Sequence, residues 1–388
     1  MLRRVPRLQS HKRIFLSQNS NQLVVVVKGL ACQVPTLFCT QKRAMELARA
    51  FAGEENESGK LAERYYGTRI DKRHFVVLKE GLDPDAAQFA LYQDEEGRPL
   101  GSPPSTAERM VYYARHASAL AVSVARKAMA DANCPSEQVT QLITVSCTGF
   151  DSPGFEFDLI EQCALPRDVG RLHVGFMGCH GSFNAMRAAQ AIARADREAN
   201  VLIVSVELCS VHMQYGSRSE DIVANALFSD GAGACVISAC EDGSEGKLVL
   251  EEFLSYVIPG SQGQMGWHIR DQGFVMDLKR EIPKSIYRHL PGVLTDWLSQ
   301  KCGMQIPQVG AWGIHPGGPR IVEAVLDCLE LPEGAADVSF HVLKQFGNMS
   351  SATVFFMLDE MARRNLPRPW LMIGFGPGLS VEAVLIRE

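Results

Sequence analysis

Three residues able to support covalent acyl chemistry lie in glycine-rich segments of this 388-residue chain. Cys179 follows Gly178 and stands shortly before an alanine-rich run, residues 184–194, that predicts a helix. His315 and Asn348 lie further along the chain, each beside glycine or proline. A thiol close to a helix N-terminus feels the positive end of the helix dipole, which favours the thiolate and makes cysteine a nucleophile. The order cysteine, histidine, asparagine therefore indicates covalent catalysis.

These three residue types serve at least two chemistries. In papain-like proteases, histidine activates cysteine and asparagine orients histidine. In decarboxylating condensing enzymes, cysteine takes an acyl group from a thioester, while histidine and asparagine donate hydrogen bonds to the carbonyl oxygen of a second thioester. Loss of carbon dioxide then leaves an enolate that both donors stabilise. The chain lacks the local cysteine signature of the proteases and a secretory signal, which favours condensation.

The composition is that of a soluble globular enzyme, with 46% hydrophobic and 21% charged residues. A net charge of −5 offers no general basic surface to nucleic acid. No apolar run reaches the roughly 18–20 residues of a membrane span. We therefore expect no nucleic-acid partner, no membrane span and no metal site. Eleven cysteines without a C-x-x-C pair do not indicate a disulfide framework, so we expect a reducing, cytoplasmic location.

The sequence divides into three segments. Residues 1–22 are basic and contain no acidic side chain, which predicts a disordered leader, with a transit peptide or an early start codon as alternatives. An acidic, glycine-rich stretch at residues 241–246 separates a first half, residues 23–240, from a second half, residues 241–388. The first half carries the cysteine and the second carries the histidine and the asparagine, so we expect the active site at the junction of the halves.

Strands that alternate with helices predict an α/β layered fold in each half. Helices are expected at residues 41–51, 106–132, 286–302, 320–329 and 350–364, and Ser105 with Glu108 predicts the capped start of the second of them. Strands are expected at residues 23–29, 142–146, 201–207, 233–239, 248–257 and 310–314, with a closing hairpin around residues 374–378.

Four motifs in order resemble those of type III polyketide synthases, the chalcone and stilbene synthase family, and the resemblance extends from about residue 23 to the C-terminus. The motifs are Gly178-Cys179 before a helix, Ile314-His315-Pro316-Gly317-Gly318-Pro319, Gly347-Asn348-Met349-Ser350-Ser351-Ala352, and Gly374-Phe375-Gly376-Pro377-Gly378-Leu379-Ser380-Val381-Glu382. The resemblance implies a five-layer αβαβα thiolase-like fold made of two similar halves, working as a homodimer. It also implies an acyltransferase that loads an acyl-CoA starter, extends it iteratively with malonyl-CoA and cyclises the product to a pyrone, resorcinol or chalcone. No cofactor is expected beyond these coenzyme A thioesters.

Carried over residue by residue, the resemblance makes Cys179 the acyl-bearing nucleophile. His315 would keep it as a thiolate and would share the decarboxylation role with Asn348. Phe228 matches the family's gatekeeper phenylalanine between the coenzyme A tunnel and the cavity. The remaining residues that we expect to line the substrate pocket are Cys147, His212, Trp267, Met276, Gly376 and Ser350, and those that we expect to bind coenzyme A are Lys60, Arg64 and Arg69.

Several positions depart from the plant enzymes. Trp267 stands where a small glycine opens the plant cavity, and Met276 replaces a second gatekeeper phenylalanine. Cys147 and His212 fall near pocket threonines, and Ser152 takes the place of a methionine that crosses the plant dimer interface. These changes favour a microbial-type member that makes pyrones, resorcinols or naphthalenes. Two alternatives stay open: a fatty-acid-type ketoacyl synthase that uses an acyl carrier protein and stops after one condensation, and an inactive scaffold of the same fold.

Overall fold

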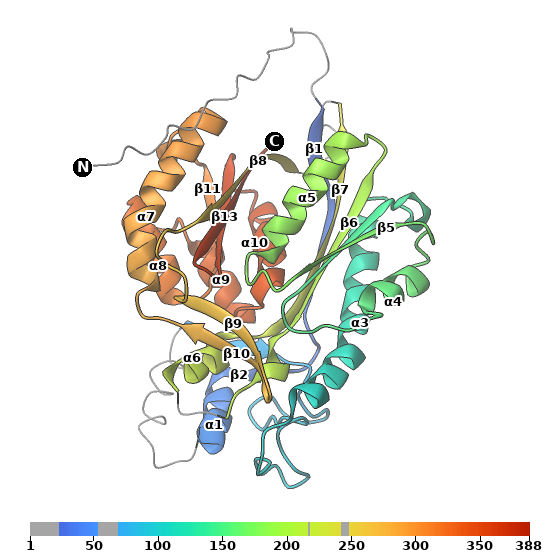
Figure 1. The fold of residues 1–388 in the computed structure, drawn as a ribbon, viewed down its shortest axis with the longest axis vertical. Coiled ribbons are helices and arrows are strands. Elements are labelled where there is room, and N and C mark those ends of the chain that lie inside the picture. The colour runs from blue at the N-terminus through green and yellow to red at the C-terminus, as the bar shows by residue number, and fades with distance from the viewer. Residues whose placement is uncertain (1–22, 53–68, 216–217, 242–247) are drawn as a thin grey trace, which may run out of the picture.

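The computed structural model describes residues 23–52, 69–215, 218–241 and 248–388. The expected leader at residues 1–22 and most of the boundary at residues 241–246 lie outside the described residues. Within them, the central feature is a nine-stranded mixed sheet with the strand order β11-β12-β13-β8-β1-β7-β6-β4-β5 (Figure 1). This order places strands from the two halves of the chain on the two sides of the β8-β1 pair.

The first half supplies five strands and the helices that cover them. β4 is parallel to both β5 and β6, whereas β7 is antiparallel to β6 and to β1. The strands are β1 (Val24–Gln33), β4 (Gln141–Ser146), β5 (Gly170–Gly175), β6 (Asn200–Leu208) and β7 (Asp230–Cys240), and the helices are α3 (Thr106–Asp131), α4 (Phe155–Gln162) and α5 (Gly181–Ala195).

The second half repeats this pairing with four strands. β11 is parallel to β12, and β13 is antiparallel to β12 and to β8. Within the nine-stranded sheet, β5 alone has no counterpart among the described strands of the second half. The elements are β8 (Leu248–Val257), β11 (Ala311–Ile314), β12 (Trp370–Gly376), β13 (Ser380–Arg387), α7 (Ile282–Trp297), α8 (Pro319–Leu329), α9 (Asp337–Phe346) and α10 (Thr353–Arg363).

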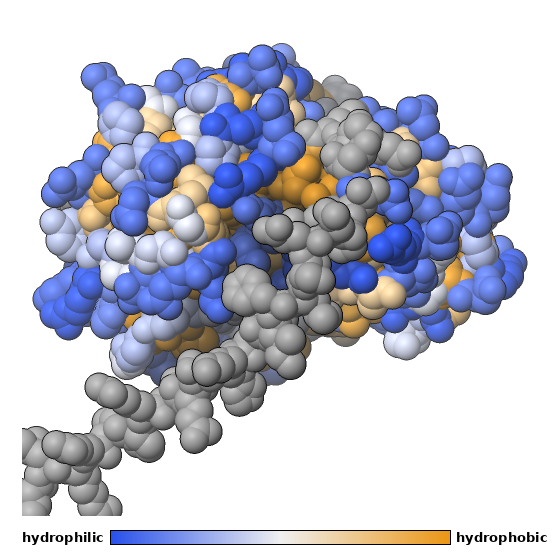
Figure 2. Space-filling model, turned by 90° about the horizontal axis from the view of Figure 1, so that it is seen from above, coloured by the Kyte–Doolittle hydropathy of each residue, from blue (hydrophilic) through white to orange (hydrophobic). Residues whose placement is uncertain are grey.

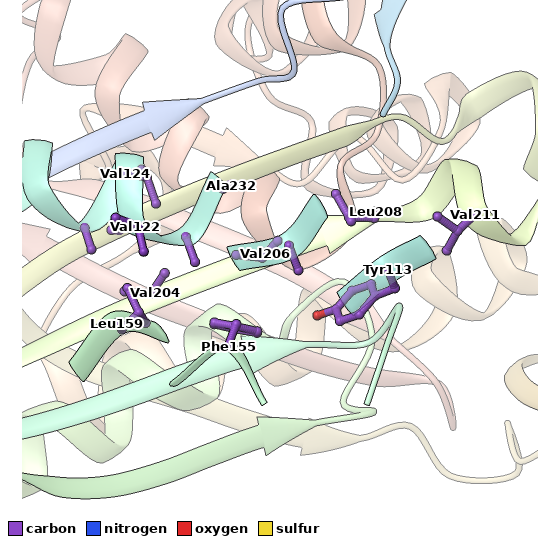
Figure 3. Close-up of a cluster of buried hydrophobic side chains, with 14 of the residues drawn as sticks. Tyr113, Val122, Val124, Phe155, Leu159, Val204, Val206, Leu208, Val211 and Ala232 are labelled. Atoms are coloured by element: carbon purple, nitrogen blue, oxygen red, sulfur yellow. The ribbon is translucent and has the colours of Figure 1, made fainter. Parts of the chain in front are cut away.

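Alternating side chains along the strands divide the hydrophobic core into an inner and two outer parts. On β6, Val201 and Ile203 belong to the inner cluster, while Leu202 and Val204 belong to an outer one. This period-two alternation is what a strand covered on both faces requires. Figure 3 shows the outer cluster of the first half, where side chains of α3 and α4 meet those of β6.

The inner cluster joins the two halves. Phe183 and Met186 of α5 and Phe355 and Leu358 of α10 are buried in it together with strand residues from both halves. The sheet therefore folds around the central pair of helices, while α7 and α8 cover the outer face of the second half (Figure 1). This arrangement confirms the expected five-layer αβαβα fold with two similar halves.

The expected elements are found with shifted bounds. Ser105 caps α3 through a capping box with Glu108, as the sequence predicts. β5, which is not among the strands expected above, is an exposed edge strand, and Leu172 on it is 44% exposed. The hairpin of β9 (Met265–Arg270) and β10 (Gly273–Leu278) is also not among the expected elements.

Further elements lie at the end of the molecule that carries this hairpin (Figure 1). They are α1 (Gln41–Ala52), β2 (Phe38–Thr40), β3 (Lys72–His74) and α6 (Ser219–Leu227). None of the helices in the described part of the chain is both long enough and apolar enough to cross a bilayer. The face at the opposite end is covered mostly by hydrophilic side chains (Figure 2).

Candidate active site

A tight turn between β5 and α5 carries Cys179. Phe176 and Gly178 in this turn have positive φ angles of 57° and 81°, and such angles favour residues without a bulky side chain. A Cβ atom on Gly178 would lie 2.3 Å from the ring of Pro377. Glycine is therefore needed at position 178 for the turn to approach the loop between β12 and β13, and Cys179 follows it two residues before α5 begins.

Backbone hydrogen bonds fix the histidine and the asparagine of the second half. His315 directly follows β11, and its N–H donates to the carbonyl of Ile373 at 2.8 Å. The N–H of Asn348 donates to the carbonyl of Leu227 at 2.9 Å, and its carbonyl accepts from the N–H of Ser229 at 2.8 Å. Phe228, between these two residues, thus lies beside Asn348 in a short parallel bridge.

The Cys179 thiol is buried and hydrogen bonded. Burial raises its pKa to about 11, the hydrogen bonds of Ser350 and Asn348 lower it, and the nearby Glu207 carboxyl raises it. The sequence predicted that the helix terminus would favour the thiolate. In the structure the loss of hydration outweighs that effect, since a charged sulfur loses more than a neutral one on leaving water. A pKa of about 11 favours the neutral thiol over the thiolate at neutral pH.

His315 is buried with no hydrogen-bond partner for either ring nitrogen among the described residues. Burial, with a smaller contribution from the neighbouring His180, lowers its pKa to about 3. Buried polar groups are nearly always paired in folded proteins. The neutral imidazole thus keeps one N–H donor and one lone pair without a partner in the described part of the protein.

The structure brings six of the seven expected pocket residues together around Cys179. Gly376 is the exception, although its neighbour Pro377 lines the pocket. The free volume inside is about 50 Å³, room for only a few water molecules. The expected residues that line this pocket, besides Cys179, are Cys147, His212, Phe228, Trp267, Met276 and Ser350.

One wall of the pocket is aromatic and rigid. The indole N–H of Trp267 donates to the carbonyl of Cys147 at 2.7 Å. The His212 ring stacks on Phe274 with ring centroids 4.1 Å apart. The N–H of Phe274 donates to Nδ1 of His212, and Nε2 donates to the carbonyl of Thr148. These bonds fix the neutral tautomer, and burial lowers the pKa of His212 to about 3.

Sequence reasoning missed Glu207, at the end of β6. Its carboxylate accepts hydrogen bonds from the N–H of Cys147, from the hydroxyl of Thr148 and from the hydroxyl of Ser351. Burial raises its pKa to about 7, and the hydrogen bond of Ser351 lowers it. The available signal was an acidic residue inside an otherwise apolar strand sequence, which is rare without a specific role.

Of the three expected coenzyme A residues, Arg69 is the one that lies in the described part of the chain. Lys60 and Arg64 fall outside the described residues. Arg69 is half exposed, 3.4 Å from Glu323, with its guanidinium 4.2 Å from the ring centroid of Phe340. Its contacts are those of a surface cation, and it does not line the pocket described above.

The described residues hold no cluster of side chains suited to a metal ion. Family models for the N-terminal and C-terminal domains of chalcone and stilbene synthases match residues 59–241 and 250–388. The chain belongs to the chalcone and stilbene synthase family. It is therefore a type III polyketide synthase, an acyltransferase that condenses malonyl-CoA iteratively into polyketides.

Its relatives support this assignment. The alpha-pyrone synthesis polyketide synthase-like Pks18 of Mycobacterium tuberculosis is 30% identical over 369 residues, which cover 93% of this chain and 91% of Pks18. The 1,3,6,8-tetrahydroxynaphthalene synthase of Streptomyces peucetius subsp. caesius is 32% identical over 274 residues, which cover 69% of this chain and 72% of that protein. The family predicted from the four motifs is thus confirmed.

Solved structures support the fold. PKS-I of the brown alga Ectocarpus siliculosus superposes with a TM-score of 0.87 at 28% identity, covering 96% of this chain and 100% of that one. A type III pentaketide synthase of Neurospora crassa superposes with a TM-score of 0.82 at 23% identity, covering 94% of this chain and 99% of the other. The second likeness concerns the fold alone.

Proposed function

We propose that this type III polyketide synthase carries its growing chain on Cys179 and decarboxylates malonyl-CoA with His315 and Asn348. The observation that supports this most strongly is the buried imidazole of His315, whose two nitrogens have no partner in the described protein. Asn348 stands at the same site, because its side chain hydrogen bonds to the sulfur of Cys179. The Asn348 side chain thus meets the thiol, and His315 neighbours His180, the residue that follows Cys179.

The loading step begins from neutral groups. As the sulfur of Cys179 attacks the starter thioester, its proton passes to the free ring nitrogen of His315. The carbon–sulfur bond to coenzyme A then breaks, and the departing thiolate takes that proton. The pKa of Cys179, about 11, makes a standing thiolate unfavourable, so a base at the moment of attack is required. His315 returns to the neutral state after each loading.

The extension step uses the same two residues as donors. One N–H of His315 and the amide N–H of Asn348 donate to the carbonyl oxygen of the malonyl thioester, where negative charge develops as carbon dioxide leaves. The enolate carbon then attacks the acyl carbon on Cys179, and the carbon–sulfur bond to the enzyme breaks, which leaves the lengthened chain on coenzyme A. The departing Cys179 thiolate takes a proton from water, so the site returns to the neutral thiol with which the next loading begins. We therefore propose that the reaction uses no further cofactor.

The pocket favours compact products. Its lining is mostly apolar and aromatic, and Trp267 and Met276 face each other as cross-strand partners on β9 and β10. An apolar, narrow cavity suits an acyl starter and products of the pyrone, resorcinol or naphthalene type. The relatives named for an alpha-pyrone and for tetrahydroxynaphthalene are consistent with this class. We propose that these two side chains limit the number of extensions.

We further propose a homodimer that works in the cytoplasm. β5 ends the sheet, and an open strand edge is able to pair with a second chain. Exposed apolar side chains surround this edge: Phe150, Leu172 and Met177 are 41%, 44% and 40% exposed. One chain has a mass of 42.7 kDa, and light scattering of the protein as it leaves a size-exclusion column should give twice that mass. The mass of a single chain would contradict the proposal.

We propose that Lys60, Arg64 and Arg69 bind coenzyme A.

The product spectrum tests the proposed function. Purified protein is incubated with malonyl-CoA and acyl-CoA starters from acetyl through long-chain to p-coumaroyl, and products are read by mass. Multi-ketide pyrones, resorcinols, naphthalenes or chalcones are the expected result. A single β-ketoacyl product, or turnover only with an acyl carrier protein, would assign the protein to ketoacyl synthase chemistry. Absence of any turnover would favour the inactive scaffold.

A further inference from the structure

A row of polar contacts joins α5 of the first half to β13 of the second, beginning at the residue after Cys179. On the α5 side, His180, Asn184 and Arg187 are spaced so that they lie on one helix face. On the strand side, Ser380 and Glu382 point to the same face of β13. Arg187 pairs with Glu382 at 2.5 Å, Asn184 donates to Glu382 at 3.1 Å, and His180 contacts Ser380 at 2.7 Å.

The hydrogen bonds of this row fix the orientation of His180. The NH₂ group of Asn184 faces the Glu382 carboxylate, so its carbonyl oxygen is the atom that lies 3.0 Å from Nδ1 of His180. An amide oxygen only accepts, and Nδ1 must therefore carry a hydrogen. Nε2 is then directed to the hydroxyl of Ser380, which also contacts the carbonyl of Pro377 at 2.9 Å.

The imidazole of His180 also packs against the glycine-rich loop between β12 and β13. A Cβ atom on Gly376 would lie 2.3 Å from the ring, so only glycine fits opposite it. The same loop presses Pro377 against Gly178, and Pro377 lines the pocket beside Cys179. His180 is buried, with 2% exposure, and takes no part in the chemistry proposed above.

We propose that His180 is a positioning residue for the condensation reaction, which holds the loop at residues 374–380 against the turn that carries Cys179 through its hydrogen bond to Ser380. The inference rests on the proposed function of that site. The loop supplies the pocket wall next to the sulfur, so its displacement changes where the polyketide chain folds relative to the thioester. Misplacement of about 1 Å at a reacting centre is able to cost about 100-fold in rate.

The choice of substitutions separates the two hydrogen bonds of the ring. In His180→Gln the amide reaches the place of Nε2 and keeps the bond to Ser380. In His180→Asn the amide stands at the place of Nδ1 and keeps only the bond to Asn184. His180→Phe keeps the volume of the ring and loses both bonds, and Ser380→Ala removes the partner on the loop.

We expect His180→Gln to stay within about 3-fold of the wild-type condensation rate and to keep its product spectrum. His180→Asn and His180→Phe should lose about 10- to 100-fold and shift the products toward shorter or derailed chains. Ser380→Ala should show a loss of the same kind, and the double variant with His180→Phe should be no slower than His180→Phe alone. His116→Phe, a change at a half-buried histidine outside the pocket that stacks on Tyr112, should leave rate and products unchanged.

Three outcomes would overturn the inference: full activity of His180→Phe, equal losses in all three His180 variants, or additive losses in the double variant. If His180 variants fail to fold, Ser380→Ala alone decides, because it deletes a single hydroxyl; unchanged products from it would contradict the inference. Acylation of Cys179 by starter CoA, followed by intact mass, separates this result from the proposed function. If the proposed function holds, Cys179 of the wild type becomes acylated. If the His180 variants are acylated normally but His180→Gln is not more active than His180→Asn and His180→Phe, the inference is contradicted and the proposed function is not.

Discussion

Cys179 and Asn348 occupy comparable places in the two halves of the fold, each in the segment that leads into the central helix of its half. α5 precedes β6 in the first half, and α10 precedes β12 in the second. Both helices pack in the same inner cluster, so their N-terminal segments converge on one site. The repeat supplies two equivalent positions, and the residue at each decides whether it delivers a nucleophile or a hydrogen-bond donor.

A second pair, Cys147 and His315, shows the same contrast. Each directly follows the strand that is parallel to β6 or to β12 in its half. The sulfur of Cys147 accepts a hydrogen bond from the N–H of Gly178 at 3.1 Å, whereas both nitrogens of His315 lack a partner among the described residues. Burial raises the pKa of Cys147 well above its usual value. Cys147 is thus a hydrogen-bonded part of the pocket wall, whereas His315 keeps unused hydrogen-bonding capacity, which the proposed mechanism assigns to the substrate.

The largest expected effect separates the two thiols. Cys179→Ala should reduce polyketide formation by about 1,000-fold or more, because no other group carries the acyl chain. Cys147→Ala should keep product formation within about 10-fold, since its thiol has a packing role. Product yield from malonyl-CoA and the preferred starter measures both. Loss in Cys147→Ala as deep as in Cys179→Ala would remove the distinction between the halves.

The next effect concerns the donor at the start of α10. Asn348→Ala should slow the release of carbon dioxide from malonyl-CoA by about 100- to 1,000-fold, because it removes one of two donors to the developing enolate. Acylation of Cys179 by the starter should change much less, since that step uses His315 as the base. Carbon dioxide release and intact mass after loading provide the two readouts. Equal losses in acylation and in decarboxylation would mean that Asn348 maintains the structure of the site and does not act as a specific donor to the enolate.

Glu207 forms hydrogen bonds with both halves, and its raised pKa predicts that the stability of the protein depends on pH. It accepts hydrogen bonds from residues after β4 and from Ser351 near the start of α10. Its pKa is about 7 when folded, against 4.5 as the ordinary value. Because the pKa of Glu207 is higher in the folded than in the unfolded state, its contribution to the free energy of unfolding is fully present below pH 4.5. This contribution, in total about 3 kcal/mol, is lost as the pH rises to about 7.

The variant Glu207→Gln should lack this loss. The difference in the free energy of unfolding between wild type and variant should therefore shift by about 3 kcal/mol in favour of the variant between pH 4.5 and pH 8. Asp230, whose pKa burial also raises to about 7, is present in both proteins and cancels in the difference. Denaturant unfolding at several pH values measures it. A difference that does not change with pH would mean that Glu207 is ionised in the folded state.

The smallest expected effect on rate is at the pocket wall. Trp267→Gly removes the indole that closes the cavity and bonds to the carbonyl of Cys147. We expect consumption of malonyl-CoA to stay within about 10-fold, with products lengthened by further extensions. Trp267→Phe is the matched control, because it keeps most of the volume. An unchanged product spectrum in Trp267→Gly would mean that Trp267 contributes to packing and does not limit product length.

Particular residues show why sequence reasoning succeeded at the motifs. Gly178 and Gly347 have backbone angles or neighbours that need glycine, so the turns that place Cys179 and Asn348 leave a signature in the sequence. The family fold followed from these motifs. The six pocket residues came from the resemblance, not from any local pattern.

The remaining features depend on three-dimensional context. The protonation state of Cys179 depends on how much protein surrounds the sulfur, which sequence position alone does not determine. Glu207 contacts Ser351, His180 contacts Ser380, and Trp267 of the β9–β10 hairpin contacts Cys147, and the two residues of each pair are more than 100 positions apart. Arg69 was assigned to coenzyme A from its family position, while its contacts are with Glu323 and Phe340.

The identity of the acylated residue tests the account most directly. The protein is incubated with a starter acyl-CoA, quenched, digested and mapped by mass, in the wild type and in Cys179→Ala and Cys147→Ala. The account predicts one acyl group per chain, on the peptide that contains Cys179, unchanged in Cys147→Ala and absent in Cys179→Ala. An acyl group on the Cys147 peptide, or none on Cys179 while polyketide still forms, would contradict it.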